Sequence, residues 1–221
     1  LQQCKYWRRK LASSLGISRA TAKSQDPAPL PETAPRVLLQ VVFVVGGPFS
    51  GKSSVCRLLA MALGYTYLAQ RRDIAEDTES AVRHQYVPPE LVVNLLRQAM
   101  TEKAEAYGSR GFVVEGFPSD HKSAVAWAAL NSDFAEVRGV VALDCSVDLM
   151  EARSTGKSIQ ERIRSWVIHT ERELHDIGKT FTVHIVNADS PVDEVAAAVS
   201  SLFMPLSGAD EDEGQAESQH R

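Results

Sequence analysis

The feature that most constrains this chain is a glycine-rich segment that directly follows an apolar run. Residues Val37–Val45 read VLLQVVFVV, with one polar residue and many β-branched side chains. The sequence GGPFSGKSS follows at residues 46–54, and apolar side chains then recur at helical spacing up to Leu63. A strand that is buried on both faces has the composition of the first run. The segment therefore predicts a buried parallel strand, a tight loop and an amphipathic helix in succession.

The loop matches the pattern G-x-x-x-x-G-K-[ST] at Gly46, Gly51, Lys52 and Ser53. Glycines let backbone N–H groups turn inward around phosphates, and the N-terminus of the following helix faces the negative charge. In this pattern the lysine reaches the β- and γ-phosphates and the serine hydroxyl joins the shell of Mg²⁺. A glycine-rich turn with an incidental lysine is the alternative, which the flanking strand and helix disfavour. The prediction is a P-loop that binds ATP and Mg²⁺ through Gly46, Gly47, Pro48, Ser50, Gly51, Lys52, Ser53 and Ser54.

Further apolar runs alternate with helical patterns along the chain. The expected strands after the first are Tyr65–Leu68, Phe112–Glu115, Gly139–Asp144 and Phe181–Val186. The expected helices are Ser53–Leu63, Pro88–Ala106, Asp120–Leu130, Val147–Arg153, Ser158–Ile177 and Pro191–Leu202. Strands that alternate with helices indicate parallel pairing. The predicted fold is an α/β P-loop NTPase fold, with a five-stranded parallel sheet and helices on both faces.

The two ends of the chain differ from its middle. Residues 1–36 are basic and include the proline-rich segment QDPAPLPETAPR, whereas residues 205–221 are acidic. Proline-rich and like-charged segments are typical of linkers and tails. The sequence therefore predicts a tail or linker at 1–36, one P-loop domain at 37–204 and an acidic disordered tail at 205–221. Both tails leave room for docking to a larger protein assembly.

Composition argues against several classes of function. The net charge of −4 disfavours a dedicated nucleic-acid binder, and no apolar run is long enough to span a membrane. The six histidines form no His-x-x-x-His pair and no zinc spacing with cysteine. Three unpaired cysteines predict free thiols in a reducing compartment, the cytoplasm. The basic head leaves a mitochondrial presequence as the alternative.

Six blocks, in order, carry a resemblance to a known family. They are GGPFSGKSSVCRLLAMALGYTYL from Gly46, YVPPELVVNLLRQAM from Tyr86, GFVVEGFPSD from Gly111, VALDCSVDLMEAR from Val141, QERIRSW from Gln160 and VNADSPVDEV from Val186. The sequence resembles the nucleoside monophosphate kinases, the group of adenylate kinase and UMP-CMP kinase. Trp127 and the pair Asp144-Cys145 resemble the UMP-CMP branch more closely.

The resemblance implies transfer of the ATP γ-phosphoryl group to a nucleoside monophosphate, AMP or UMP/CMP. It implies that Lys52, Arg153 and Arg162 supply the positive charge at the transferred group. It also implies that Glu115 stands where the family has an aspartate that holds Mg²⁺ through water, beside Ser53. On the acceptor side the matching residues are Gly116, Phe117 and Pro118. The alternative for the two arginines is a solvated helix face, and for Glu115 a pairing with a nearby lysine.

The departures from the family pattern gather on the acceptor side. Ser119 replaces an arginine that grips the monophosphate, and Ala75 aligns with a second such arginine, with Arg71 and Arg72 nearby. Lys157 stands where the family usually has another arginine, and a lysine cannot make a bidentate contact.

The loops around the predicted phosphate site depart as well. Only STGKSIQE separates Arg153 from Arg162, so the lid is short, and Phe49 replaces a P-loop glycine. Three interpretations remain open: a slow or altered monophosphate kinase, a nucleotide-binding module that has lost catalysis within a larger assembly, and a kinase for a different small acceptor.

Overall fold

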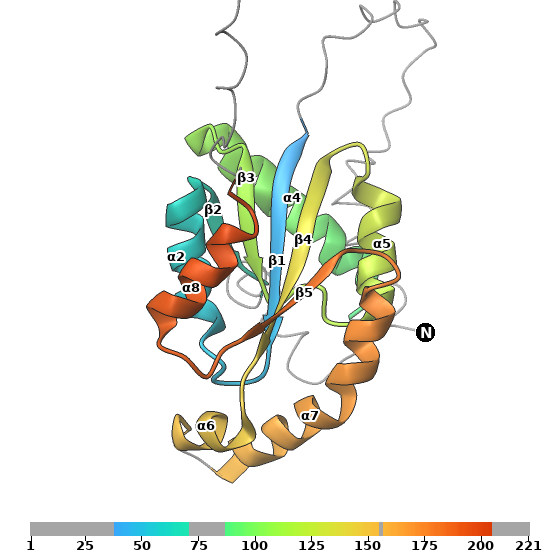
Figure 1. Ribbon diagram of the computed structural model, residues 1–221. Coiled ribbons are helices and arrows are strands. Elements are labelled where there is room, and N and C mark those ends of the chain that lie inside the picture. The colour runs from blue at the N-terminus through green and yellow to red at the C-terminus, as the bar shows by residue number, and fades with distance from the viewer. Residues whose placement is uncertain (1–37, 71–86, 155–156, 205–221) are drawn as a thin grey trace, which may run out of the picture.

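The computed structural model describes residues 38–70, 87–154 and 157–204, and it shows the predicted α/β fold (Figure 1). Five parallel strands form one sheet in the order β2-β3-β1-β4-β5. The strands are β1 (Leu39–Gly46), β2 (Thr66–Ala69), β3 (Gly111–Glu115), β4 (Ala135–Asp144) and β5 (Val183–Asn187). The run before the glycine-rich loop is therefore the central strand, as its composition predicts.

Helices cover both faces of the sheet (Figure 1). They are α2 (Lys52–Leu63), α4 (Pro89–Tyr107), α5 (His121–Asn131), α6 (Val147–Ala152), α7 (Lys157–Ile177) and α8 (Val192–Ser201). Helices α2 and α8 lie on one face, and α4 and α5 lie on the other, where the second half of α7 reaches α5. None of the helices among the described residues has the length and apolarity needed to cross a membrane.

The alternation of side chains along β1 divides the core into two layers. Val41 and Phe43 pack with α4 and α5, while Val42 and Val44 pack with α2 and α8. All four side chains are fully buried. The Phe43 ring meets the ring of Trp127 edge to face, with centroids 5.1 Å apart. This double burial is the reason that β1 has an almost continuous apolar sequence rather than an alternating one.

Strand β4 begins earlier than the sequence predicts, at Ala135 rather than Gly139. Its added residues pair with the start of β1, and the register then shifts so that Val41 faces Val137 and Val42 faces Gly139. The charged residues Glu136 and Arg138 interrupt the apolar pattern there. Only the part of this strand after the bulge at Arg138 therefore has an apolar sequence, and only that part is predicted from the sequence.

Parallel pairing places the carboxyl ends of the strands at one edge of the sheet, the lower edge in Figure 1. The loops after β1, β3 and β4 meet at this edge, where ligands bind in open α/β sheets. The predicted tails at 1–36 and 205–221 lie outside the described residues, as do Arg71, Arg72 and Ala75. The side chain of Lys157 is not described either.

Candidate functional site

The glycine-rich segment joins the end of β1 to the start of α2. Gly51 is the N-cap of α2 and has a positive φ of 89°, a conformation that glycine adopts without strain. Because no side chain caps this helix, its first turn offers backbone N–H groups and the positive end of the helix dipole to a ligand. The local structure is therefore that of an anion site, as the motif predicts.

Close packing beneath the loop explains why two further positions hold small residues. A Cβ on Gly47 would lie 2.5 Å from Met150 Sδ and 3.0 Å from Trp166 Cδ1. Ser50 is only 2% exposed and lies against Gly46, where an added Cβ would be 2.8 Å from its Oγ. The loop is thus held between the sheet and the elements α6 and α7, which limits its freedom to move.

The two remaining features of the loop are the positions of Lys52 and Phe49. Lys52 Nζ donates a hydrogen bond to the carbonyl oxygen of Gly47 at 2.5 Å, which folds the lysine over the loop. Phe49 adopts a positive φ of 61° and is 39% exposed. The side chain is thus partly exposed where it lines the cavity, and the left-handed backbone of this non-glycine residue costs about 1–2 kcal/mol.

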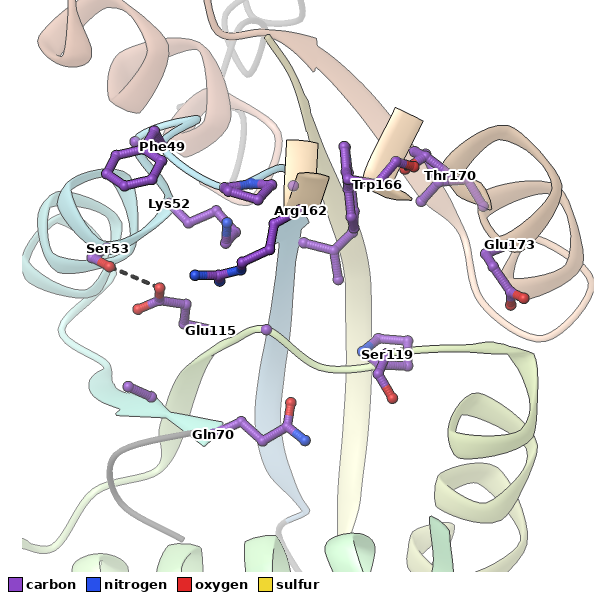
Figure 2. A pocket seen from close by; sticks show the side chains of 18 of the residues that line it. Phe49, Lys52, Ser53, Gln70, Glu115, Ser119, Arg162, Trp166, Thr170 and Glu173 are labelled. Carbon is purple, nitrogen blue, oxygen red and sulfur yellow. Dashed lines mark hydrogen bonds between the residues drawn. The ribbon is translucent and has the colours of Figure 1, made fainter. Parts of the chain in front are cut away.

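Ser53 and Glu115 meet across the site, although 62 positions separate them in the sequence. The Ser53 hydroxyl on α2 donates to Glu115 Oε1 at 2.7 Å, at the end of β3 (Figure 2). The Tyr67 hydroxyl on β2 donates to the other carboxylate oxygen, Oε2. No pattern in the sequence around Tyr67 indicates this contact. Register alone reveals it, because Tyr67 pairs with Val113 and therefore lies on the same face of the sheet as Glu115.

The oxygen atoms of Ser53 and Glu115 fit the chemistry of Mg²⁺. Magnesium prefers oxygen ligands and is commonly held by one or two protein groups together with substrate phosphates and water. Among the described residues, no group of three or more His, Cys, Asp or Glu side chains forms a site that would hold a metal by itself. The pair therefore suits a metal that arrives with a phosphate ligand, and not a separate structural metal site.

Both predicted arginines line the same cavity as Lys52. Arg153 follows α6, and its Nη1 lies 3.3 Å from the carbonyl oxygen of Phe49 and 3.8 Å from Cys145 Sγ. Arg162 extends from α7 toward Lys52 and Glu115 (Figure 2). Both residues are exposed to solvent and also line the cavity, so their predicted contact with the phosphates of a nucleotide stays a prediction.

The residues after β3 divide between the cavity and the core. Gly116 and Pro118 line the cavity together with Ser119. The Phe117 side chain is fully buried, with its ring 5.0 Å from that of Phe43 between centroids. A contact between Phe117 and an acceptor would therefore have to come from its backbone. The aromatic side chain itself anchors the loop that carries Pro118 and Ser119.

The cavity is large, about 1040 Å³, and reaches well beyond the loop. Besides the residues already described, its walls include Gln70 after β2 and one side of α7 (Figure 2). The α7 residues are Arg162, Ser165, Trp166, His169, Thr170, Glu173, Leu174 and Ile177. Of these residues, only Arg162 is predicted from the sequence to lie at the site. The others follow it at spacings that place them on the same face of a helix, and this pattern is visible in the sequence.

Two cysteines near the site are buried thiols with raised pKa values. Cys56 and Cys145 are free and buried, as predicted for the thiols, while Cys4 lies outside the described residues. Burial raises the pKa of the Cys56 thiol far above its usual range. Burial also raises the pKa of Cys145, although the nearby Arg153 acts in the opposite direction. Both therefore remain neutral thiols near physiological pH, and the chemistry of the site rests on the charged and hydroxyl groups.

Comparisons with known proteins agree with this geometry. The model of a family described as an AAA domain matches residues 45–166, more than half of the chain. A UMP-CMP kinase of Xenopus tropicalis is 29% identical over 189 residues, which cover 74% of this chain and 96% of that protein. UMP-CMP kinase 3 of Arabidopsis thaliana is 27% identical over 186 residues, covering 75% of this chain and 89% of that protein. The chain belongs to the AAA-domain family and is a divergent nucleoside monophosphate kinase relative.

A third match has a different extent. Adenylate kinase isoenzyme 5 of Homo sapiens is 26% identical over 191 residues, which cover 74% of this chain but only 33% of that longer protein. The resemblance seen in the sequence blocks is thus confirmed, together with the fold. The range matched by the family model contains Lys52, Glu115, Arg153 and Arg162, and it ends at Trp166. The rest of α7 lies beyond it.

Proposed function

We propose that this protein transfers the γ-phosphoryl group of ATP to a nucleoside monophosphate, AMP or UMP/CMP. The observation that carries the proposal is the hydrogen-bonded pair Ser53 and Glu115 beside Lys52, at one end of a cavity that continues past β3. A P-loop alone would suit any nucleotide-binding protein. The additional space lined by Gly116 and Pro118 has room for a second substrate.

In this reaction an oxygen of the acceptor phosphate attacks the γ-phosphorus, and the bond from that phosphorus to the β-bridging oxygen breaks, releasing ADP. The acceptor oxygen is already anionic, so the protein does not have to remove a proton. Its work is to position the substrates and to stabilise the charge on the transferred group. Lys52 would exchange the Gly47 carbonyl for phosphate oxygens, and Arg162 extends toward the same place.

Magnesium, when bound with ATP, neutralises phosphate charge, and Ser53 and Glu115 are the residues that would hold it. Arg153 is anchored on the Phe49 carbonyl at the mouth of the loop. From there it would contact the donor nucleotide. Only eight residues separate Arg153 from Arg162, so we expect water to compete with the acceptor and slow ATP hydrolysis to accompany transfer.

A phosphotransfer assay with the full chain tests the proposal. ATP and Mg²⁺ are combined with radiolabelled AMP, UMP or CMP. Labelled diphosphate then measures transfer and unlabelled ADP measures consumption of ATP, also when AMP is the acceptor. We expect diphosphate from at least one acceptor, with more ADP than diphosphate because of hydrolysis. Lys52→Ala is the control without transfer. If the protein binds MgATP but forms no diphosphate from any of the three acceptors, the proposal is wrong.

The second candidate function is a nucleotide-binding module that has lost catalysis. It is favoured by the acceptor end of the cavity, where Ser119 and Glu173 stand and where an arginine would be expected. Three further points remain proposals as well. They are docking through the tails, the absence of nucleic-acid and membrane partners, and a cytoplasmic or mitochondrial location. The same assay separates the two functions, since the module binds ATP without forming a diphosphate.

A further inference from the structure

The two ends of the cavity carry opposite charge. Among the described residues, the lysine and arginine side chains that line it are Lys52, Arg153 and Arg162. These three surround the P-loop end. Farther from the loop, the described polar residues that line the cavity are Gln70, Ser119, His169, Thr170 and Glu173, and among them Glu173 is the carboxylate.

The Glu173 carboxylate is held in place at this far end. It extends from α7 toward the loop that carries Ser119 (Figure 2). Its Oε2 accepts a hydrogen bond from the backbone N–H of His121 at 3.1 Å. His121 is the first residue of α5, so the carboxylate interacts favourably with the positive end of that helix. Glu173 is half-buried, and its charge therefore stays close to any ligand in this part of the cavity.

Several polar groups around Glu173 are already hydrogen-bonded, so they do little to attract an anion against the negative charge of the carboxylate. The backbone N–H groups of Ser119 and Asp120 both donate to Ser123 Oγ, each at 3.1 Å. The Thr170 hydroxyl donates to the Trp166 carbonyl at 2.5 Å. These donors are therefore engaged by acceptors within their own loop and helix. Among the described residues at this end, a phosphate therefore meets the Glu173 carboxylate and several donors that are already engaged.

We propose that Glu173 is a specificity-determining residue that weakens acceptor binding at this end of the cavity, and does so more strongly the more phosphate charge the acceptor carries. The inference rests on the proposed function, because it concerns the acceptor of that reaction. Repulsion between a carboxylate and a phosphate dianion falls only with the first power of distance, so Glu173 acts without direct contact. Discrimination of this kind arises from a repulsive group built into the site as readily as from an attractive one.

The test replaces the charge and keeps the hydrogen bond. In Glu173→Gln the side-chain carbonyl still accepts from the His121 N–H, so capping of α5 is retained while the negative charge is lost. Binding of uridine, UMP and UDP to the full chain is measured by calorimetry. We expect UMP to bind about tenfold more tightly to the variant, equivalent to about 1.4 kcal/mol. UDP should gain more than UMP, and uridine should be unaffected.

The matched control is Glu105→Gln, which makes the same charge change on the exposed surface of α4, outside the cavity. It should leave all three affinities unchanged. A folded Glu173→Gln protein with unchanged UMP affinity overturns the inference. So does an equal gain for uridine and UMP, since that would indicate rearrangement rather than charge. If Glu173→Gln does not fold, Glu173→Met removes the charge with a side chain of similar length and is subject to the same criteria.

Turnover separates this inference from the proposed function. Where diphosphate is formed, Glu173→Gln should lower the KM for UMP and leave kcat and the KM for ATP unchanged. Where none is formed by either protein, the proposed function fails, but the binding series with uridine, UMP and UDP still decides the role of Glu173.

Discussion

Replacement of Glu115 by glutamine separates the structural role of this residue from its proposed role at the metal. Glu115 accepts from Ser53 Oγ at 2.7 Å and from the Tyr67 hydroxyl, one bond to each carboxylate oxygen. Glutamine has a single side-chain oxygen and therefore accepts only one of the two bonds, and toward the other hydroxyl its uncharged NH₂ group can only donate. A hydrogen bond to a charged group contributes about 1.5–3 kcal/mol when buried, and less at this half-exposed position. We expect a loss of about 1 kcal/mol, which lowers the Tm by about 2–4 °C for a domain of this size.

The effect on nucleotide binding should depend on the metal. Without the carboxylate, the site loses the negative charge that faces Mg²⁺, so MgATP should bind at least about tenfold more weakly, or about 1.4 kcal/mol. ATP without metal should bind as well as before or better, because a carboxylate near its phosphates has been neutralised. The opposite signs follow from charge alone.

Calorimetric titration of ATP, once with Mg²⁺ and once with a chelator, measures both effects on the same protein. Tyr67→Phe is the control, since it removes one hydrogen bond from Glu115 and keeps the charge. It should lower the Tm by a similar amount and preserve MgATP affinity. Equal weakening of ATP and MgATP in Glu115→Gln would point to a distorted loop, and the assignment of Glu115 to the metal would be refuted.

Three further substitutions test the loop and the acceptor side. Lys52→Ala should weaken MgATP binding at least about tenfold, or about 1.4 kcal/mol, and unchanged affinity of the folded variant by calorimetry would refute the P-loop assignment. Gly47→Ala should cost about 1–3 kcal/mol in thermal or urea unfolding, because the new Cβ would lie 2.5 Å from Met150 Sδ. Ser119→Arg should lower the acceptor KM in the phosphotransfer assay by about tenfold, since an arginine contact to a phosphate contributes about 1.5–3 kcal/mol when buried. No response to Ser119→Arg, with normal ATP binding, would favour the module without catalysis.

Local patterns were sufficient for the fold and for the position of the glycine-rich loop. The central strand and the loop at Gly46–Ser54 follow from burial on both faces and from glycine-dependent backbone geometry. Both depend on neighbouring residues, so the sequence by itself determines them. The start of β4, in contrast, does not follow from neighbouring residues. Its first residues pair with β1 despite their charges, and a bulge at Arg138 restores the register. Pairing with another strand, not local composition, decides that boundary.

The residues that line the rest of the cavity were decided only by the tertiary structure. Tyr67 reaches Glu115 because of the register between β2 and β3, and Phe117, predicted to lie at the acceptor, turns its ring into the core. Glu173 comes to the cavity because α7 packs against the start of α5. Each of these contacts joins residues more than 40 positions apart or depends on which face of an element is buried. The sequence determines where a strand ends and a helix begins, but the side chains that share one cavity are selected by how those elements pack.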